Sequence, residues 1–100
     1  MKIILTFVAL AFIAGCAGLG TQHANCVNNN KAFSDVTRCV NATMGSDADP
    51  RVQMYVLKAN QLNESVKEKR MSELDARVAL QDTMLSIYRD AAAAYGAIRR

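Results

Sequence analysis

The first fifteen residues differ in composition from the rest of the chain. Lys2 is followed by eleven residues, Ile3 to Ile13, that are apolar except for one threonine, and two small residues come next. A membrane-spanning helix needs about twenty apolar residues, whereas extending this run to Leu19 gives only 17 residues that include two glycines and a cysteine. A permanent transmembrane anchor is therefore the weaker interpretation. The pattern predicts a signal peptide over residues 1–15 that is removed on export, which leaves one small domain to fold.

The end of this leader, Ile13-Ala14-Gly15-Cys16, resembles the lipobox of bacterial lipoproteins. The resemblance implies that Cys16 becomes the first residue of the mature protein and carries a diacylglycerol and an N-acyl chain such as palmitate. Acyl chains contribute about 0.8 kcal/mol per buried CH₂ group, so three chains would hold the protein at a membrane permanently. Ala17 stands where an aspartate would, in enterobacteria-like systems, favour the inner membrane, so the outer membrane is expected. We expect the anchored body to face the periplasm. An ordinary signal peptide cleaved near Ala17 is the alternative.

Cys26 and Cys39 remain as a pair once Cys16 is acylated, and an exported compartment favours a disulfide between them. A closed loop of this length stabilises a fold by roughly 3 kcal/mol. Thirteen helical steps would separate the two α-carbons by about 20 Å, whereas a disulfide needs less than about 7 Å. The chain must therefore turn back between them, and Asn28-Asn29-Asn30 is the expected place because asparagine accepts turn conformations.

A redox pair or a metal site fits these cysteines less well than a structural disulfide. The spacing is not the Cys-x-x-Cys arrangement that lowers a thiol pKa, and His23, the only histidine, would leave a tetrahedral site one ligand short. We therefore expect no metal and no cofactor apart from the acyl chains on Cys16. Residues 16–33 are poor in large apolar side chains, which predicts a flexible tether on which His23 is solvated.

An all-α domain is predicted over residues 34–100. Its three helices are expected at about 35–43, 50–69 and 73–98. The first has Ser34 as a candidate N-cap, the second opens with Asp49-Pro50, and the third opens with Ser72-Glu73-Leu74-Asp75, which resembles a capping box. The expected arrangement is a short disulfide-linked helical segment plus an antiparallel hairpin of the two longer helices. Apolar residues at steps of three and four support the first two helices: Phe33, Val36, Val40 and Met44, then Val52, Tyr55, Ala59, Leu62 and Val66.

A single helix from Pro50 to Ile98 is the alternative to this hairpin. Continuing the heptad of the second helix would place polar residues in the apolar seam, namely Lys69, Glu73, Thr83 and Asp90. Restarting the count gives a largely apolar stripe that is expected to pack on the second helix: Leu74, Val78, Gln81, Leu85, Tyr88, Ala92 and Tyr95. The phase therefore resets near Arg70 to Ser72, where a turn is expected.

The third helix also carries a second apolar stripe that begins at Leu80. The first helix spans about three turns and is too short to cover the whole third helix, so we expect part of this stripe to remain available to an envelope protein or a second copy. The candidate partner face comprises Met84, Ile87, Ala91, Ala94 and Ile98. The alternative is that the alanine run only favours helix formation and needs no partner.

The composition argues against several classes of function. A formal net charge of +3 is too small to indicate a nucleic-acid partner. The helical part has no histidine and no free thiol, so neither catalysis nor a small-molecule substrate is expected. The chain is similar in general plan to small helical lipoproteins of Gram-negative bacteria, which implies a membrane-anchored structural or interaction role in the envelope. The alternative is a surface inhibitor or exclusion lipoprotein that binds an envelope or incoming protein through the disulfide-held loop.

Overall fold

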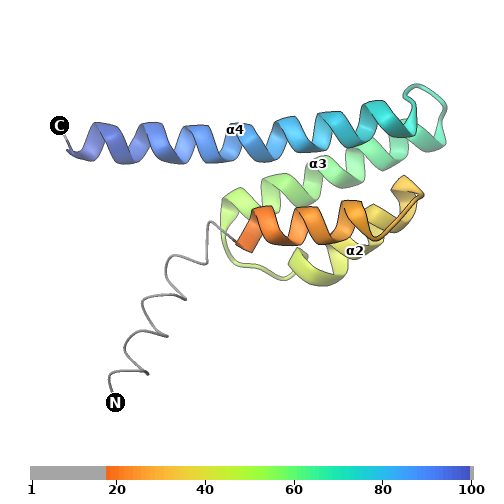
Figure 1. The fold of residues 1–100 in the computed structure, drawn as a ribbon, viewed down its shortest axis with the longest axis horizontal. Coiled ribbons are helices and arrows are strands. Elements are labelled where there is room, and N and C mark those ends of the chain that lie inside the picture. Colours follow the sequence, from red (N-terminus) through yellow and green to blue (C-terminus); the bar gives the residue numbers. More distant parts are fainter. Residues whose placement is uncertain (1–17, 100) are drawn as a thin grey trace, which may run out of the picture.

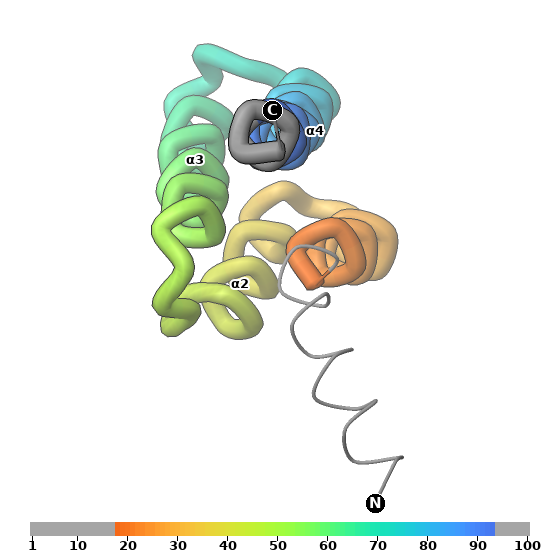
Figure 2. Tube along the Cα trace, turned by 90° about the vertical axis from the view of Figure 1, so that its left-hand side faces the viewer, coloured from red at the N-terminus to blue at the C-terminus, as the bar shows by residue number. Residues whose placement is uncertain are grey.

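The computed structural model describes residues 18–99, with side chains as far as Ala93, and this part of the chain is all-helical. An N-terminal helix over residues 18–28 is followed by α2 (Phe33–Met44), α3 (Pro50–Lys67) and α4 (Glu73–Arg99). Successive helices run in opposite directions (Figure 1) and surround a common core when seen end-on (Figure 2). The predicted all-α class is confirmed, but the described residues form four helical segments where three were expected.

The two longer helices begin at the predicted signals. Asp49 Oδ1 accepts a hydrogen bond from the backbone N–H of Arg51 at 2.9 Å, and Pro50 is the first residue of α3. Ser72 Oγ accepts from the backbone N–H of Asp75 at 3.1 Å. Each bond satisfies one of the N–H groups that have no partner in the first helical turn. Local sequence is therefore enough to define both starting points.

The turn between α3 and α4 falls close to the predicted phase reset. α3 ends at Lys67, and Lys69 adopts a left-handed conformation with φ 60°. The N–H of Lys69 bonds to the carbonyl of Val66 at 3.1 Å, and the N–H of Arg70 bonds to the carbonyl of Ser65 at 2.9 Å. This pair of bonds is the Schellman arrangement that closes a helix. Glycine usually takes this left-handed position, because it has no Cβ that would be strained there. In this chain lysine occupies it.

α2 begins earlier than predicted because its first turn is capped from a distant part of the chain. Its N-cap is Ala32 rather than Ser34, and no side chain at the N-cap accepts a hydrogen bond. The N–H of Phe33 instead donates to Oε1 of Glu73 at 3.1 Å. The first residue of α4 thus satisfies a donor at the start of α2, a contact that local sequence does not reveal.

The core takes one face from each helix. The predicted stripes of α2 and α3 are buried except for half-buried Val66, with the following residues at most 5% exposed: Phe33, Val36, Val40, Met44, Val52, Tyr55, Ala59 and Leu62. α4 adds Ala76 and Leu80, and the N-terminal helix adds Leu19 and Cys26. Burial of apolar surface is the main term that stabilises folding, so the fold depends on all four segments.

The N-terminal helix corrects the prediction of a flexible tether over residues 16–33. Leu19 is 5% exposed and Cys26 is fully buried, although the segment is polar on average. Leu19, His23 and Cys26 follow one another at steps of four and three, so they share one helical face. That face packs into the bundle beside α2 and α4 (Figure 2). The low apolar content of the segment therefore gave no indication of its three buried side chains. Of the expected tether, only residues 16 and 17 lie outside the described range.

Candidate functional site

The disulfide joins the N-terminal helix to α2. Cys26 and Cys39 are bonded, with their α-carbons 5.5 Å apart. The chain reverses between them after the N-terminal helix ends at residue 28, which is where the asparagine run predicted a turn. The Asn30 side chain donates to the carbonyl of Cys26 at 2.8 Å. The predicted bond and turn are both present, and together they fix the N-terminal helix against the body.

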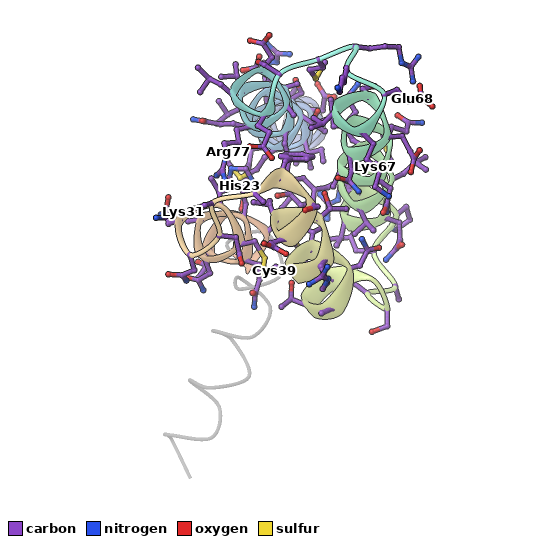
Figure 3. All side chains as sticks on the ribbon, turned by 90° about the vertical axis from the view of Figure 1, so that its right-hand side faces the viewer. His23, Lys31, Cys39, Lys67, Glu68 and Arg77 are labelled. Carbon is purple, nitrogen blue, oxygen red and sulfur yellow. A yellow bond between two sulfur atoms is a disulfide. The ribbon has the colours of Figure 1, made fainter. Side chains whose placement is uncertain are left out.

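Arg77 of α4 holds the C-terminal end of the N-terminal helix. Its guanidinium donates to the carbonyls of Val27 at 3.0 Å, Asn30 at 2.7 Å and Lys31. The last carbonyls of a helix have no partner within it, and the negative end of the helix dipole attracts a cation. Figure 3 shows Arg77 close to the turn that carries Lys31. The turn over residues 29–32 is therefore fixed by the disulfide and by α4 together.

His23 is a core residue, which corrects the prediction that it is solvated. It is 7% exposed, and its Nδ1 lies 2.5 Å from Oη of Tyr55 in α3. Burial lowers the pKa of His23 and raises the pKa of Tyr55, because each charged form would lose its hydration. The pair is therefore neutral near pH 7, as buried polar groups with a shared hydrogen bond commonly are. The spacing of His23 from Leu19 and Cys26 was the only sequence signal for this position.

The chemistry of the His23–Tyr55 pair is limited by its enclosure. Two surface depressions, of about 180 and 300 Å³, are not lined by either residue. The hydrogen bond and the edge-to-face ring contact of His23 with Tyr55 join the N-terminal helix to α3.

Over residues 18–99, His, Cys, Asp and Glu side chains form no group of three or more that could hold a metal ion. No helix in that range has the length and hydropathy needed to span a membrane.

The structure reverses the roles of the two apolar stripes of α4. Leu80 is fully buried, and Met84 and Ile87 of the predicted partner face are partly buried against the core. Ala91 is half-buried, whereas the side chains of Ala94 and Ile98 lie outside the described part of the chain. The stripe expected to pack is instead largely exposed, with Leu74 at 69%, Val78 at 51% and Leu85 at 51%, although its member Tyr88 is partly buried against the core. A helix with two apolar faces does not specify by its periodicity which one meets the core.

The exposed stripe is a compact feature. At 100° per residue, Leu74, Val78 and Leu85 fall within an arc of about 40° on one side of α4. Two further large apolar side chains, Met54 and Leu57, are 63% and 59% exposed on α3. Single exposed apolar residues are ordinary on protein surfaces, but an aligned set is typical of an interaction surface. We refer to Leu74, Val78 and Leu85 as the α4 surface stripe.

The folded body begins very close to the predicted anchor. Cys16 lies outside the described residues, and two residue steps, at most about 7 Å of extended chain, connect it to Gly18. The backbone N–H of Gly20 donates to Tyr88 Oη at 2.9 Å, and a Cβ at Gly20 would lie 3.1 Å from the same oxygen. Glycine thus permits the N-terminal helix to approach α4 closely at this end. At most two residue steps therefore separate the predicted anchor position from the first described residue of this helix.

Comparison with protein-family models, curated proteins and solved structures gives no significant match. Function is therefore inferred from the residues and their arrangement. The informative features are the lipobox-like leader, the pairing of Cys26 with Cys39, and the α4 surface stripe.

Proposed function

We propose that the mature protein is a lipid-anchored envelope protein with a non-enzymatic structural or interaction role. Cys16 carries the diacylglycerol and the N-acyl chain, and the helical body lies on the periplasmic face of the outer membrane. The observation that carries the proposal is the use of the cysteines. The chain has three cysteines, two of them form the disulfide, and the third ends the lipobox-like sequence.

The disulfide supports this proposal because it fits a protein that is exported from the cytosol. A disulfide between Cys26 and Cys39 is stable in an oxidising compartment and is rare in the cytosol. The described helices bury their apolar side chains in a common core within the chain itself. Under this proposal the acyl chains on Cys16 supply the permanent attachment to the membrane.

The interaction role is supported by the α4 surface stripe. Leu74, Val78 and Leu85 expose apolar side chains along one side of α4, where burial against another protein would be favourable. This surface replaces the predicted face at Met84 and Ile87, which already contacts the core. An envelope protein or a second copy of this chain is the kind of partner that the stripe fits.

Intact mass spectrometry of the protein extracted from membranes tests the anchor directly. Loss of residues 1–15, addition of three acyl chains and a deficit of two hydrogens for the disulfide are expected together. The matched variant is Cys16→Ser, which removes the acylated sulfur and leaves the described body unchanged. We expect Cys16→Ser to keep the leader and to lack the acyl mass. Recovery of the wild-type protein with a free Cys16 thiol, or cut after Cys16, would disprove the proposal.

A second candidate function is a surface inhibitor that binds through the disulfide-held turn. The specific observation in its favour is rigidity, because the turn is fixed by the Cys26–Cys39 bond and by three hydrogen bonds from Arg77, while Asn28, Asn29 and Lys31 are exposed. A preordered loop loses little conformational entropy on binding. Alanine substitution at Asn28, Asn29 and Lys31 should abolish partner capture under this hypothesis, whereas Leu74→Ser with Val78→Ser should abolish it under the first.

A further inference from the structure

The outward side of α4 carries charges of both signs along one edge of the α4 surface stripe. Asp82 and Arg89 are exposed and lie seven residues apart, so they share this edge and are separated by about 10 Å along the helix. Leu85 lies between them in the apolar centre, and the opposite edge presents the uncharged Gln81. The stripe therefore has an apolar centre, one edge with charges of opposite sign and one neutral edge.

Neither charge is neutralised within the described part of the chain. The ion pairs found there join other residues, and the guanidinium of Arg89 donates to Ser86 Oγ at 3.4 Å. Charged residues that flank an apolar seam select the partner and the orientation of paired helices. Asp82 and Arg89 are therefore available to pair with charges on another molecule.

A second copy of the chain supplies the complementary charges when the two α4 helices run antiparallel. In a two-fold contact, any two residues that face each other across the interface do so twice, once from each copy. Placing Asp82 opposite Arg89 of the second copy therefore forms two ion pairs, and the two-fold axis crosses α4 beside Leu85. The Leu85 side chains of the two copies then meet at the axis, and Val78 meets Ala92 of the second copy.

The charges disfavour the other simple arrangements of such a pair. A parallel pair in register would place Asp82 beside Asp82 and Arg89 beside Arg89, and like charges across an interface repel. An antiparallel pair shifted by about two turns, with Asp75 opposite Arg89, would bring the two copies of Asp82 together at the axis. The favoured register pairs residues 78–93, all of which have described side chains, and leaves Leu74 outside the contact.

The rest of the body leaves this side of α4 free. Leu80, which is fully buried, faces the core from the opposite side of the helix, and Figure 2 shows the other helices to the left of α4 and below it. Gly20 contacts Tyr88, which lies about 4 Å from the two-fold axis along α4. The two N-terminal helices therefore begin near the middle of the pair and at equal height along the axis, so both anchors can enter one leaflet.

The small size of the contact makes the lipid anchor relevant to it. One face of one helix over about four turns is smaller than the roughly 800 Å² per partner of a standard interface, so the pair would be weak in dilute solution. Acyl chains on Cys16 would confine both copies to one leaflet, and this confinement raises their effective concentration.

We propose, on the basis of the anchored interaction role proposed above, that the partner of the α4 surface stripe is a second copy of this chain. The two α4 helices pack antiparallel, with Leu85 of both copies at the centre. Ion pairs between Asp82 of each copy and Arg89 of the other fix the direction and the register.

The test is site-specific cross-linking of the acylated mature protein in phosphatidylcholine vesicles. Leu85→Cys places a thiol beside the two-fold axis, and Leu74→Cys is the matched control on the same stripe. A short bismaleimide joins nearby thiols without an oxidant, so the Cys26–Cys39 bond is preserved. We expect the cross-linked dimer to form about fivefold or more faster at position 85, because the two copies of position 74 lie about 35 Å apart, although Leu74 is the more exposed residue. If Leu85→Cys itself weakens the pair, a mixture of Val78→Cys and Ala92→Cys proteins reports the same register.

Charge reversal provides the second arm of the experiment, with cross-linking at position 85 as the readout and circular dichroism as the check of folding. Asp82→Arg and Arg89→Asp should each weaken the pair about tenfold, because two attractions become two repulsions. The double variant that carries both changes should recover the pair, and so should a mixture of the two single variants, because opposite charges again face each other.

Equal cross-linking at positions 74 and 85 would refute the proposal, since random collisions or a parallel pair would produce it. A double variant that stays as weak as the single variants would also refute it. The intact mass of each sample reports acylation separately. Acylated protein without the position-85 cross-link would disprove the dimer and leave the anchor standing. Protein without acyl chains would disprove the anchor, and the same cross-link read in concentrated solution would then decide on the dimer.

Discussion

Replacing Leu19 with alanine tests whether the N-terminal helix is part of the folded body. Leu19 is 5% exposed and belongs to the core cluster. Leucine-to-alanine changes at such sites cost about 2–5 kcal/mol, because transfer free energy is lost and a cavity is left. Taking about 3 kcal/mol, and 4–8 °C per kcal/mol for a domain of this size, we expect the Tm to fall by about 12–24 °C.

The matched control is Leu85→Ala, which deletes the same atoms from a side chain that is 51% exposed. A surface change of this kind alters the free energy of unfolding by about 0.5 kcal/mol or less. Both variants are measured as mature proteins in mild detergent, by thermal and urea unfolding followed with far-ultraviolet circular dichroism. A Tm shift for Leu19→Ala no larger than that for Leu85→Ala would mean that the segment is a tether after all.

Three further measurements address the contacts of the N-terminal helix, and one addresses the turn between α3 and α4. Because burial holds the pKa of His23 below 6.5 in the folded state, the unfolded state binds a proton more readily, so stability should be complete above about pH 6.5 and decrease as the pH falls below it. In His23→Gln this part of the pH dependence, measured by urea unfolding from pH 7.5 to 5, should disappear. Lys69→Gly should raise the free energy of unfolding by about 0.5–1 kcal/mol by relieving the left-handed strain at φ 60°, and an unchanged or lower value would argue against the Schellman turn. Arg77→Ala should cost about 2 kcal/mol because three carbonyls lose a charged donor, with Arg77→Lys recovering only part of it. The double variant Cys26→Ala with Cys39→Ala should lose about 3 kcal/mol, and a stability that is insensitive to reducing agent would contradict this role of the disulfide.

Under the proposed acylation of Cys16, the short connection to the body would affect how the protein meets a partner. A flexible tether would let the bundle rotate freely above the membrane, whereas two residue steps between Cys16 and Gly18 restrict its height and tilt. If the proposed anchor holds, Leu74 and Val78 lie near the end of α4 that is farther from it, where a periplasmic partner could reach them. Leu85 lies closer to the end at which Tyr88 contacts Gly20, so under the same proposal a partner that uses the whole α4 surface stripe would come nearer the lipid surface.

The sequence alone was sufficient for features that depend on neighbouring residues. Apolar steps of three and four located the buried faces of α2 and α3, and Asp49 and Ser72 marked where α3 and α4 begin, because periodicity and capping act over one or two turns. The disulfide and the turn between its cysteines followed from covalent geometry and the cysteine count. These features need no knowledge of what packs against them.

Only the tertiary structure decided which surfaces meet. The sequence did not reveal the N-terminal helix, because its three buried side chains, at Leu19, His23 and Cys26, barely change the average composition of a polar segment. Their burial also depends on surfaces of α2, α3 and α4 that meet them only in the folded protein. α4 has apolar residues on two sides. Leu80 rather than Leu85 lies in the core because the other helices pack against the side of α4 that carries Leu80. Contacts between distant residues, such as Glu73 with Phe33 and Arg77 with Lys31, likewise exist only once the helices are assembled, since local propensity carries no information about partners far along the chain.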